Sequence, residues 1–187
     1  MNRGHNRERI FDEDADYRVF LNAVHQACSR HDVEIHGFAL MKNHFHLLVT
    51  PPTSVGIGEA TKAFESKYCH YYNRKHRRIG SIWNGRYHDV PIESGWHWFV
   101  CLRYIELNPV RAGIVDDPAA YRWTSYQVHA AGSNANPWLA SHPVYENLGA
   151  SAEERQMVYR AICTGPLSEA ELTLMRNPPV VQLAATG

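Results

Sequence analysis

Two histidines stand two residues apart in the segment Asn43–Val49, NHFHLLV. Side chains alternate between the two faces of a strand, so a strand here places His44 and His46 on one face. Two imidazoles on one strand face can bind a single divalent metal ion. The alternative is a pair of hydrogen-bonded histidines on a half-exposed sheet, because a chain with 12 histidines can contain this spacing by chance.

Tyr104 and Asn108 form a second pair that could take part in catalysis. They are four residues apart in a segment that predicts a helix, so they lie on one helix face. A metal ion can polarise a phosphodiester while a tyrosine beside it attacks phosphorus and forms a covalent intermediate. The alternative for Tyr104 is that it is one of 10 tyrosines and covers an edge of the core.

The net charge of the chain hides a strongly basic stretch. The 187 residues include 19 Lys and Arg and 19 Asp and Glu, which gives a net charge of zero. Residues 62–88 contain seven basic side chains and one acidic side chain, which leaves +6. Tyr68, Tyr71, Tyr72 and Trp83 are interleaved with them. Cations among aromatic rings suit a phosphate backbone with unstacked bases, whereas the alternative is a solvated helix face whose aromatic side chains enter the core.

Length and composition exclude several protein classes. A chain that is 44% hydrophobic and 20% charged is typical of a globular protein with one domain of ordinary size. There is no apolar run long enough to span a membrane and no secretion signal. The four cysteines are far apart, which excludes a disulfide scaffold and a Cys-based zinc ribbon. We therefore expect a cytoplasmic protein with no membrane partner.

Periodicity predicts the elements that carry these residues, in the order helix, strand, strand, helix, strand, helix. Ser94 is a candidate N-cap of the last helix, and Pro109 predicts its end at about Asn108. This order favours an α+β sandwich with helices on one face of a mostly antiparallel sheet. The expected ranges are residues 12–29, 33–41, 44–50, a helix starting after 54–56, 87–92, and 94–108.

The C-terminal part has a different character. The segment 132–137, GSNANP, has the composition of a linker. Beyond it, Ser151-x-x-Glu154 and Ser168-x-x-Glu171 are capping boxes that predict two short helices. We expect a catalytic-type domain over residues 1–130, followed by a linker and helical extension over residues 131–187.

The motifs together resemble a known family. NHFHLLV, followed by YIELNPVRAGIV, resembles the paired signature of the HUH single-strand DNA transposases. The chain is most similar to the REP-associated tyrosine transposases, or IS200-like transposases. Segments 2–4, 82–87 and 121–126 also resemble family landmarks in the expected order, so the resemblance covers residues 2–126. The tail over residues 137–163 is similar to the extension of longer members.

The resemblance implies a ferredoxin-like sandwich with an antiparallel sheet and a metal-dependent endonuclease and strand-transferase activity. It implies that His44, His46 and Asn108 bind Mg²⁺ or Mn²⁺. Tyr104 matches the nucleophile, which would take the 5′ phosphate of the cut strand and leave a free 3′ hydroxyl.

The partner implied by the resemblance is single-stranded DNA with hairpin elements, such as repetitive extragenic palindromes, bound by a monomer or homodimer in the nucleoid. We expect the positive side chains to contact the DNA backbone. The candidates are Arg3, Arg74, Lys75, Arg77, Arg78 and Arg86.

Two departures from the family pattern affect these expectations. Lys42 stands where relatives usually have proline. The family also has a strand before its Asn-Arg-Gly segment, whereas this sequence begins at Met1, so the first strand of the sheet is expected to be missing. Either the start lies upstream or the copy is truncated. A truncated copy could bind hairpin DNA without cutting it, and a structural metal site with no nucleic-acid role is a third hypothesis.

Overall fold

The computed structural model describes residues 1–176. Its centre is an antiparallel hairpin of β2 (Glu34–Met41) and β3 (His44–Thr50), joined by the turn at Lys42 and Asn43. A two-residue strand, β1 (Asn2–Arg3), pairs antiparallel with β3, so the strand order in the described residues is β1-β3-β2. The two predicted strands are therefore confirmed, and β1 coincides with the first two residues of the Asn-Arg-Gly segment.

Eight α-helices and two short 3₁₀ helices complete the described part of the chain. The predicted helices beginning near residues 12, 54 and 94 are all present. The α-helices are α1 (Asp14–Arg30), α2 (Ser54–His76), α3 (Gly95–Glu106), α4 (Asn108–Arg111), α5 (Tyr126–Ala131), α6 (Pro143–Glu146), α7 (Ala152–Cys163) and α8 (Glu169–Arg176). The 3₁₀ helices are η1 (His5–Arg7) and η2 (Pro118–Ala120).

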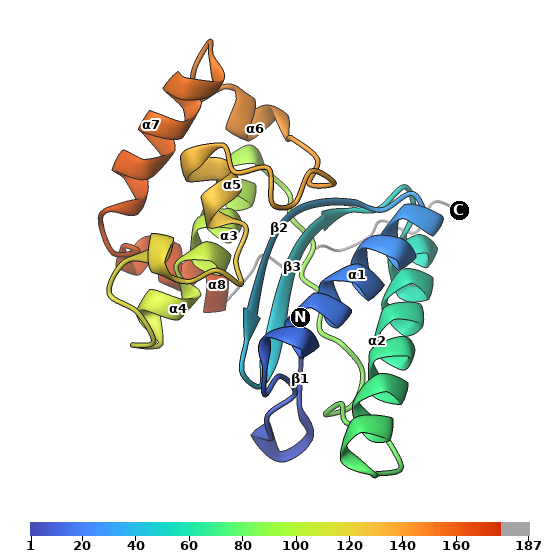
Figure 1. Ribbon diagram of the computed structural model, residues 1–187. Helices are drawn as coiled ribbons and strands as arrows, with labels where there is room; N and C mark the ends of the chain where they lie inside the picture. Colours follow the sequence, from blue (N-terminus) through green and yellow to red (C-terminus); the bar gives the residue numbers. More distant parts are fainter. Residues whose placement is uncertain (177–187) are drawn as a thin grey trace.

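Helices cover both faces of the sheet, not one as the sequence pattern suggested. α1 and α2 lie on one face, and α3 with the C-terminal helices lies on the other (Figure 1). The physical reason is visible in β2, where every residue after Glu34 is buried, because both faces of this strand meet a core. The antiparallel α+β sandwich itself is confirmed.

The first core, between the sheet and helices α1 and α2, is dominated by aromatic rings. Phe20 of α1 packs against Phe45 of β3 and Phe64 and Tyr68 of α2. Three of the four aromatic residues of the basic stretch, Tyr68, Tyr72 and Trp83, are buried in this core, so their rings face the protein interior and not an open nucleic-acid surface.

The second core joins α3 to the C-terminal helices. Glu106 is fully buried and accepts hydrogen bonds from Ser125, from His129 Nδ1 at 2.7 Å and from the Tyr159 hydroxyl at 2.7 Å. The extension is thus packed directly on the helix that carries Tyr104. The division at residues 130 and 131 stays a prediction, and residues 177–187 lie outside the described residues.

Caps and prolines set the ends of the helices near Tyr104. The Ser94 hydroxyl accepts from the backbone N–H of His97, which confirms Ser94 as an N-cap. α3 ends at Glu106, and a second helix starts at Asn108 with Pro109 in its first turn, where the missing N–H costs nothing. Tyr104 and Asn108 therefore lie on two successive helices and not on one, as the spacing suggested.

The predicted strand over residues 87–92 is wrong. This segment is irregular, and its backbone meets Met1 only at His88, whose N–H donates to the Met1 carbonyl oxygen at 2.8 Å. Pro91 has no N–H to continue such a ladder. Both predicted C-terminal caps are confirmed, with Ser151 and Ser168 accepting from the backbone N–H groups of Glu154 and Glu171.

Candidate active site

β3 directs the two histidines toward α3, as the alternation of its side chains predicts. Phe45 points into the first core, whereas Leu48, on the face of His44 and His46, is part of the second core with α3. Both histidines are half-buried, and their ring centroids are 5.1 Å apart. The strand thus holds two imidazoles side by side at the surface between the sheet and α3.

The structure brings Tyr104 and Asn108 to this pair. The Asn108 side-chain Nδ2 lies 3.1 Å from His46 Nε2, and the Tyr104 ring packs edge-on against the His46 ring at a centroid distance of 6.0 Å. The break between α3 and α4 does not separate the two residues, because Leu107 continues the turn with its N–H bonded to the Arg103 carbonyl oxygen. The predicted nucleophile and the three predicted metal ligands therefore lie together, around His46.

The histidines are held in the form that binds metals. Burial is the main cause that lowers the pKa of His46 to about 3, and the amino terminus, Arg111 and the charge that His44 would carry if protonated act in the same direction. Burial and the neighbouring Arg3 lower the pKa of His44 as well. Both imidazoles are consequently neutral near pH 7, and a neutral imidazole has one nitrogen lone pair that can bind a metal ion.

The donor set fits a divalent cation. Two neutral imidazoles and a side-chain amide offer nitrogen and oxygen ligands of the kind that Mn²⁺ accepts, and water or phosphate oxygens could supply the rest. Among residues 1–176, no group of three or more His, Cys, Asp or Glu side chains could hold a metal ion. The candidate metal ligands at this site are His44, His46 and Asn108, as the sequence predicts.

Sequence reasoning missed Arg111 of α4. Its guanidinium carbon lies 4.4 Å from the centroid of the Tyr104 ring, within the range of a cation–π contact. The spacing in the sequence could have indicated this contact, because Arg111 is seven residues after Tyr104, close to two helical turns. This contact places a positive charge beside the Tyr104 ring.

The N-terminal segment lies against the same strand. Arg3 is exposed and directly opposite His44 in the register of β1 and β3. Gly4 follows, and a Cβ atom at this position would lie 2.3 Å from the Glu8 carbonyl oxygen, so only glycine fits. Arg3 therefore reaches the candidate site from the edge of the sheet.

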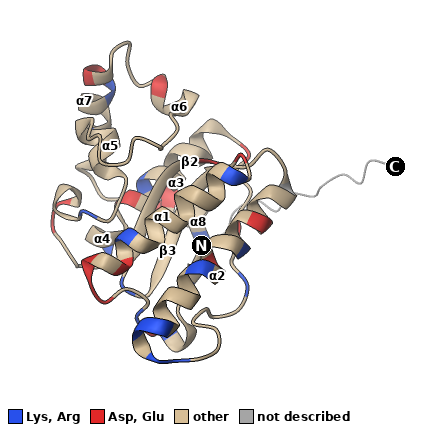
Figure 2. Cartoon of the chain, turned by 45° about the vertical axis from the view of Figure 1, so that its right-hand side comes forward, with Lys and Arg blue, Asp and Glu red and all other residues tan. Residues whose placement is uncertain are grey.

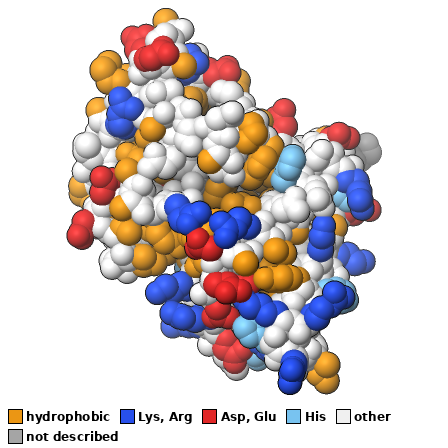
Figure 3. All heavy atoms as spheres, in the orientation of Figure 1, with side chains coloured by type: hydrophobic (Ala, Val, Ile, Leu, Met, Phe, Trp, Pro, Cys, Tyr) orange, Lys and Arg blue, Asp and Glu red, His pale blue; other side chains and the backbone are white. Residues whose placement is uncertain are grey.

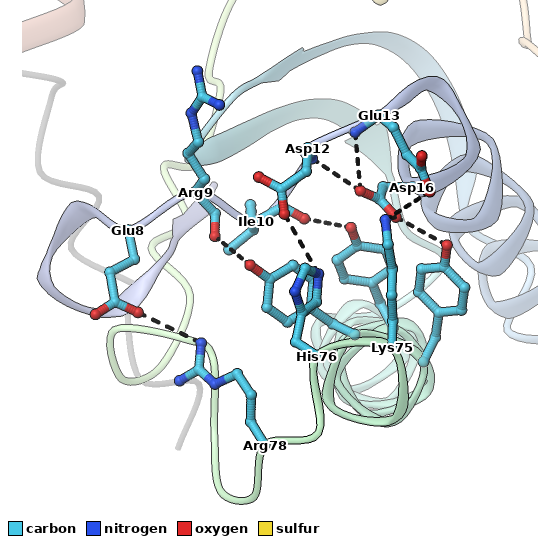
Figure 4. Close-up of polar contacts among 12 residues, drawn as sticks. Glu8, Arg9, Ile10, Asp12, Glu13, Asp16, Lys75, His76 and Arg78 are labelled. Atoms are coloured by element: carbon cyan, nitrogen blue, oxygen red, sulfur yellow. Dashed lines mark hydrogen bonds and ion pairs between the residues drawn. The ribbon is translucent and has the colours of Figure 1, made fainter.

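The basic stretch is less available for DNA than its charge suggests. Basic residues gather in the last turn of α2 (Figure 2). There, Lys75 pairs with Asp16 at 2.6 Å and with Glu13 at 2.8 Å. Arg78 pairs with Glu8 at 3.5 Å (Figure 4). On the face drawn in Figure 3, acidic side chains are interspersed with the basic ones.

Three of the predicted DNA contacts in this stretch remain without an acidic partner among the described residues. Arg74 and Arg77 are exposed at the end of α2, and Arg86 is exposed on the loop that follows. Arg86 also borders a groove of about 630 Å³ between α2 and residues 80–87, which Lys62 lines from the other side. These cations are open to a phosphate backbone.

Comparison with known proteins finds one matching family and a similar solved structure. The family model described as Transposase IS200 like matches residues 1–108. A solved structure of a REP-associated tyrosine transposase bound to a REP hairpin is similar to this chain, with a TM-score of 0.60 and 18% sequence identity. The match covers 75% of this chain and 82% of the chain in that structure. The comparison with curated proteins finds no match. Within residues 1–176, no helix has the length and apolar character required to cross a membrane.

Proposed function

Because the chain belongs to the IS200-like transposase family, we propose that it cuts and rejoins single-stranded DNA next to hairpins, with Tyr104 as nucleophile. The observation that supports this most directly is that Tyr104 and Asn108 both contact His46, although Asn108 is 62 residues away from it in the sequence. A tyrosine beside two neutral imidazoles and an amide suits phosphoryl transfer to a side chain.

In the proposed step, the Tyr104 oxygen forms a bond to phosphorus while the bond from phosphorus to the 3′ oxygen breaks. The phenol loses its proton and the departing 3′ oxygen gains one, so the products are a 5′-phosphotyrosine and a free 3′ hydroxyl. No water is consumed, so the 3′ hydroxyl can reverse the step and rejoin a strand. Mg²⁺ or Mn²⁺, held by His44, His46 and Asn108, would polarise the phosphodiester and stabilise its developing charge.

We place the DNA backbone along the unpaired cations. Arg3 reaches the site from β1, and Arg111 covers the Tyr104 ring. Arg74, Arg77 and Arg86 supply positive charge around α2 and its following loop. Lys75 and Arg78 are paired with carboxylates, so they contact DNA in this proposal only where phosphate groups displace these carboxylates.

The test is a covalent adduct. A single strand with a flanking hairpin, incubated with the full chain and Mn²⁺, is expected to yield a protein–DNA band on a denaturing gel. Tyr104→Phe should abolish the band, whereas Tyr145→Phe, a tyrosine of α6, should preserve it. Chelation of the metal and His44→Ala should each remove it too. An adduct at full yield in Tyr104→Phe would contradict the nucleophile, and salt-sensitive binding with no adduct in the wild type would favour a non-catalytic DNA binder.

A further inference from the structure

Asn43, in the turn directly before His44, makes two side-chain hydrogen bonds that define its orientation. Its Nδ2 lies 3.1 Å from the backbone carbonyl oxygen of Arg7, and its Oδ1 lies 2.7 Å from His44 Nδ1. A backbone carbonyl oxygen can only accept a hydrogen bond, so the amide group facing Arg7 has to be the NH₂. The atom facing His44 is therefore the oxygen.

This orientation determines which nitrogen of His44 carries the proton. An amide oxygen accepts but does not donate, so Nδ1 must be the donor. A neutral imidazole has one N–H, which leaves the lone pair on Nε2. We propose that Asn43 is a positioning residue that holds His44 in the Nδ1–H tautomer and thereby keeps Nε2 available as a metal ligand. This inference rests on the proposed metal site and adds a partner outside its ligand set.

The contact also ties His44 to the N-terminal segment. The Arg7 carbonyl is presented by the η1 turn, in which Asn6 and Arg7 have φ values of 51° and 61°, in the left-handed region. Such a conformation needs surrounding contacts to be maintained. Asn43 supplies two of them, through its side chain to Arg7 and through its carbonyl oxygen, which accepts from the Gly4 N–H at 2.8 Å.

The two roles of Asn43 have one consequence for DNA binding. Gly4 is the N-cap of the η1 turn and directly follows Arg3, Arg7 is the last residue of that turn, and Arg3 lies opposite His44. One amide thus fixes both the imidazole and the segment that carries a proposed phosphate contact. A change in this segment is transmitted to the orientation of His44 through two hydrogen bonds.

The experiment compares metal-free and Mn²⁺-titrated full-length protein. In wild type, ¹⁵N NMR of the metal-free protein at neutral pH should show His44 as a single Nδ1–H tautomer. Asn43→Ala should give a mixture of tautomers, and calorimetry should show Mn²⁺ affinity lowered by about 10- to 100-fold. Asn43→Asp keeps an acceptor for Nδ1, although it loses the donor to the Arg7 carbonyl oxygen, and should restore the tautomer. Asn22→Ala, on the exposed side of α1, is the matched control and should change neither.

Two results would overturn the proposal. One is a proton on Nε2 of His44 in the wild type, which requires no variant and so does not depend on how a variant folds. The other is unchanged Mn²⁺ affinity in Asn43→Ala. Failure of the wild type to bind Mn²⁺ would count against the proposed function instead, and the tautomer shift between wild type and Asn43→Ala would still decide the role of Asn43.

Discussion

At the scale of single residues, burial and hydrogen bonds decide which charged groups serve the fold and which serve the site. Asp16 is fully buried, and it accepts from Lys75, from the Tyr71 hydroxyl and from two backbone N–H groups (Figure 4). Burial alone would raise the pKa of its carboxyl, but these donors outweigh burial and lower it. Asp16 therefore connects α1 to α2. Its partner Lys75 is one of the residues that the sequence predicted to contact DNA.

We expect Asp16→Asn to lower the free energy of unfolding at pH 7 by about 1–3 kcal/mol, because a buried charge-assisted network loses its acceptor. A lowered pKa means that the ionised carboxyl stabilises the protein above its unfolded pKa, about 3.9, and that this stabilisation is lost as pH falls through the folded value. Urea unfolding between pH 7 and pH 3 should therefore show the difference shrinking toward low pH. A difference in unfolding free energy that stays constant with pH would contradict the stabilising role of ionised Asp16. The control is Asp14→Asn in the exposed ion pair with Arg122, which should change stability by less than about 1 kcal/mol.

At the scale of elements, α3 is fixed by the helices that follow the family-matched segment. Arg103, next to Tyr104, is buried and pairs with the buried Glu171 of α8, and it also donates to the Ile162 carbonyl oxygen at 3.0 Å. Glu106, two residues after Tyr104, is bonded to α5 and α7. The position of Tyr104 beside His46 thus depends on contacts from the C-terminal extension.

We expect Arg103→Met to destabilise the protein by about 3–5 kcal/mol, because it leaves the Glu171 carboxylate buried without its cation. Adding Glu171→Gln should recover part of the loss, since the remaining partner is then uncharged. Denaturant unfolding of the single and double variants measures both effects. Additive losses in the double variant would show that the pair is not coupled.

At the scale of the whole molecule, the net charge is zero, but some basic side chains are paired with acidic residues and others are not. The acidic segment over residues 8–16 lies against the end of α2 and neutralises Lys75 and Arg78. Arg74, Arg77 and Arg86 have no ion pair with any described residue. Electrostatic binding to DNA depends on the cations that reach phosphates and not on the sum of charges.

We expect the logarithm of the hairpin-DNA affinity to fall linearly with the logarithm of salt concentration. Substituting Arg74→Gln and Arg77→Gln should reduce the magnitude of this slope by about 0.7 for each single-strand phosphate contact that is lost. Lys75→Gln should act mainly on stability, because its ammonium group is held by Asp16 and Glu13. Fluorescence anisotropy measures these slopes. Equal slopes in the wild type and in the double Arg variant would show that Arg74 and Arg77 do not contact the DNA. Arg122→Gln is the matched control.

Local patterns in the sequence determined the elements and much of the site. Alternation along β3 predicted the shared face of His44 and His46, and Ser94 and Pro109 predicted the ends of α3, because these features depend on neighbours within a few residues. Tertiary structure decided what depends on distant segments. It placed Asn108 beside His46, paired Lys75 with α1, turned Tyr68 into the core and brought Arg7 to Asn43. Residue spacing cannot predict such contacts, because they form only when segments far apart in the chain pack together.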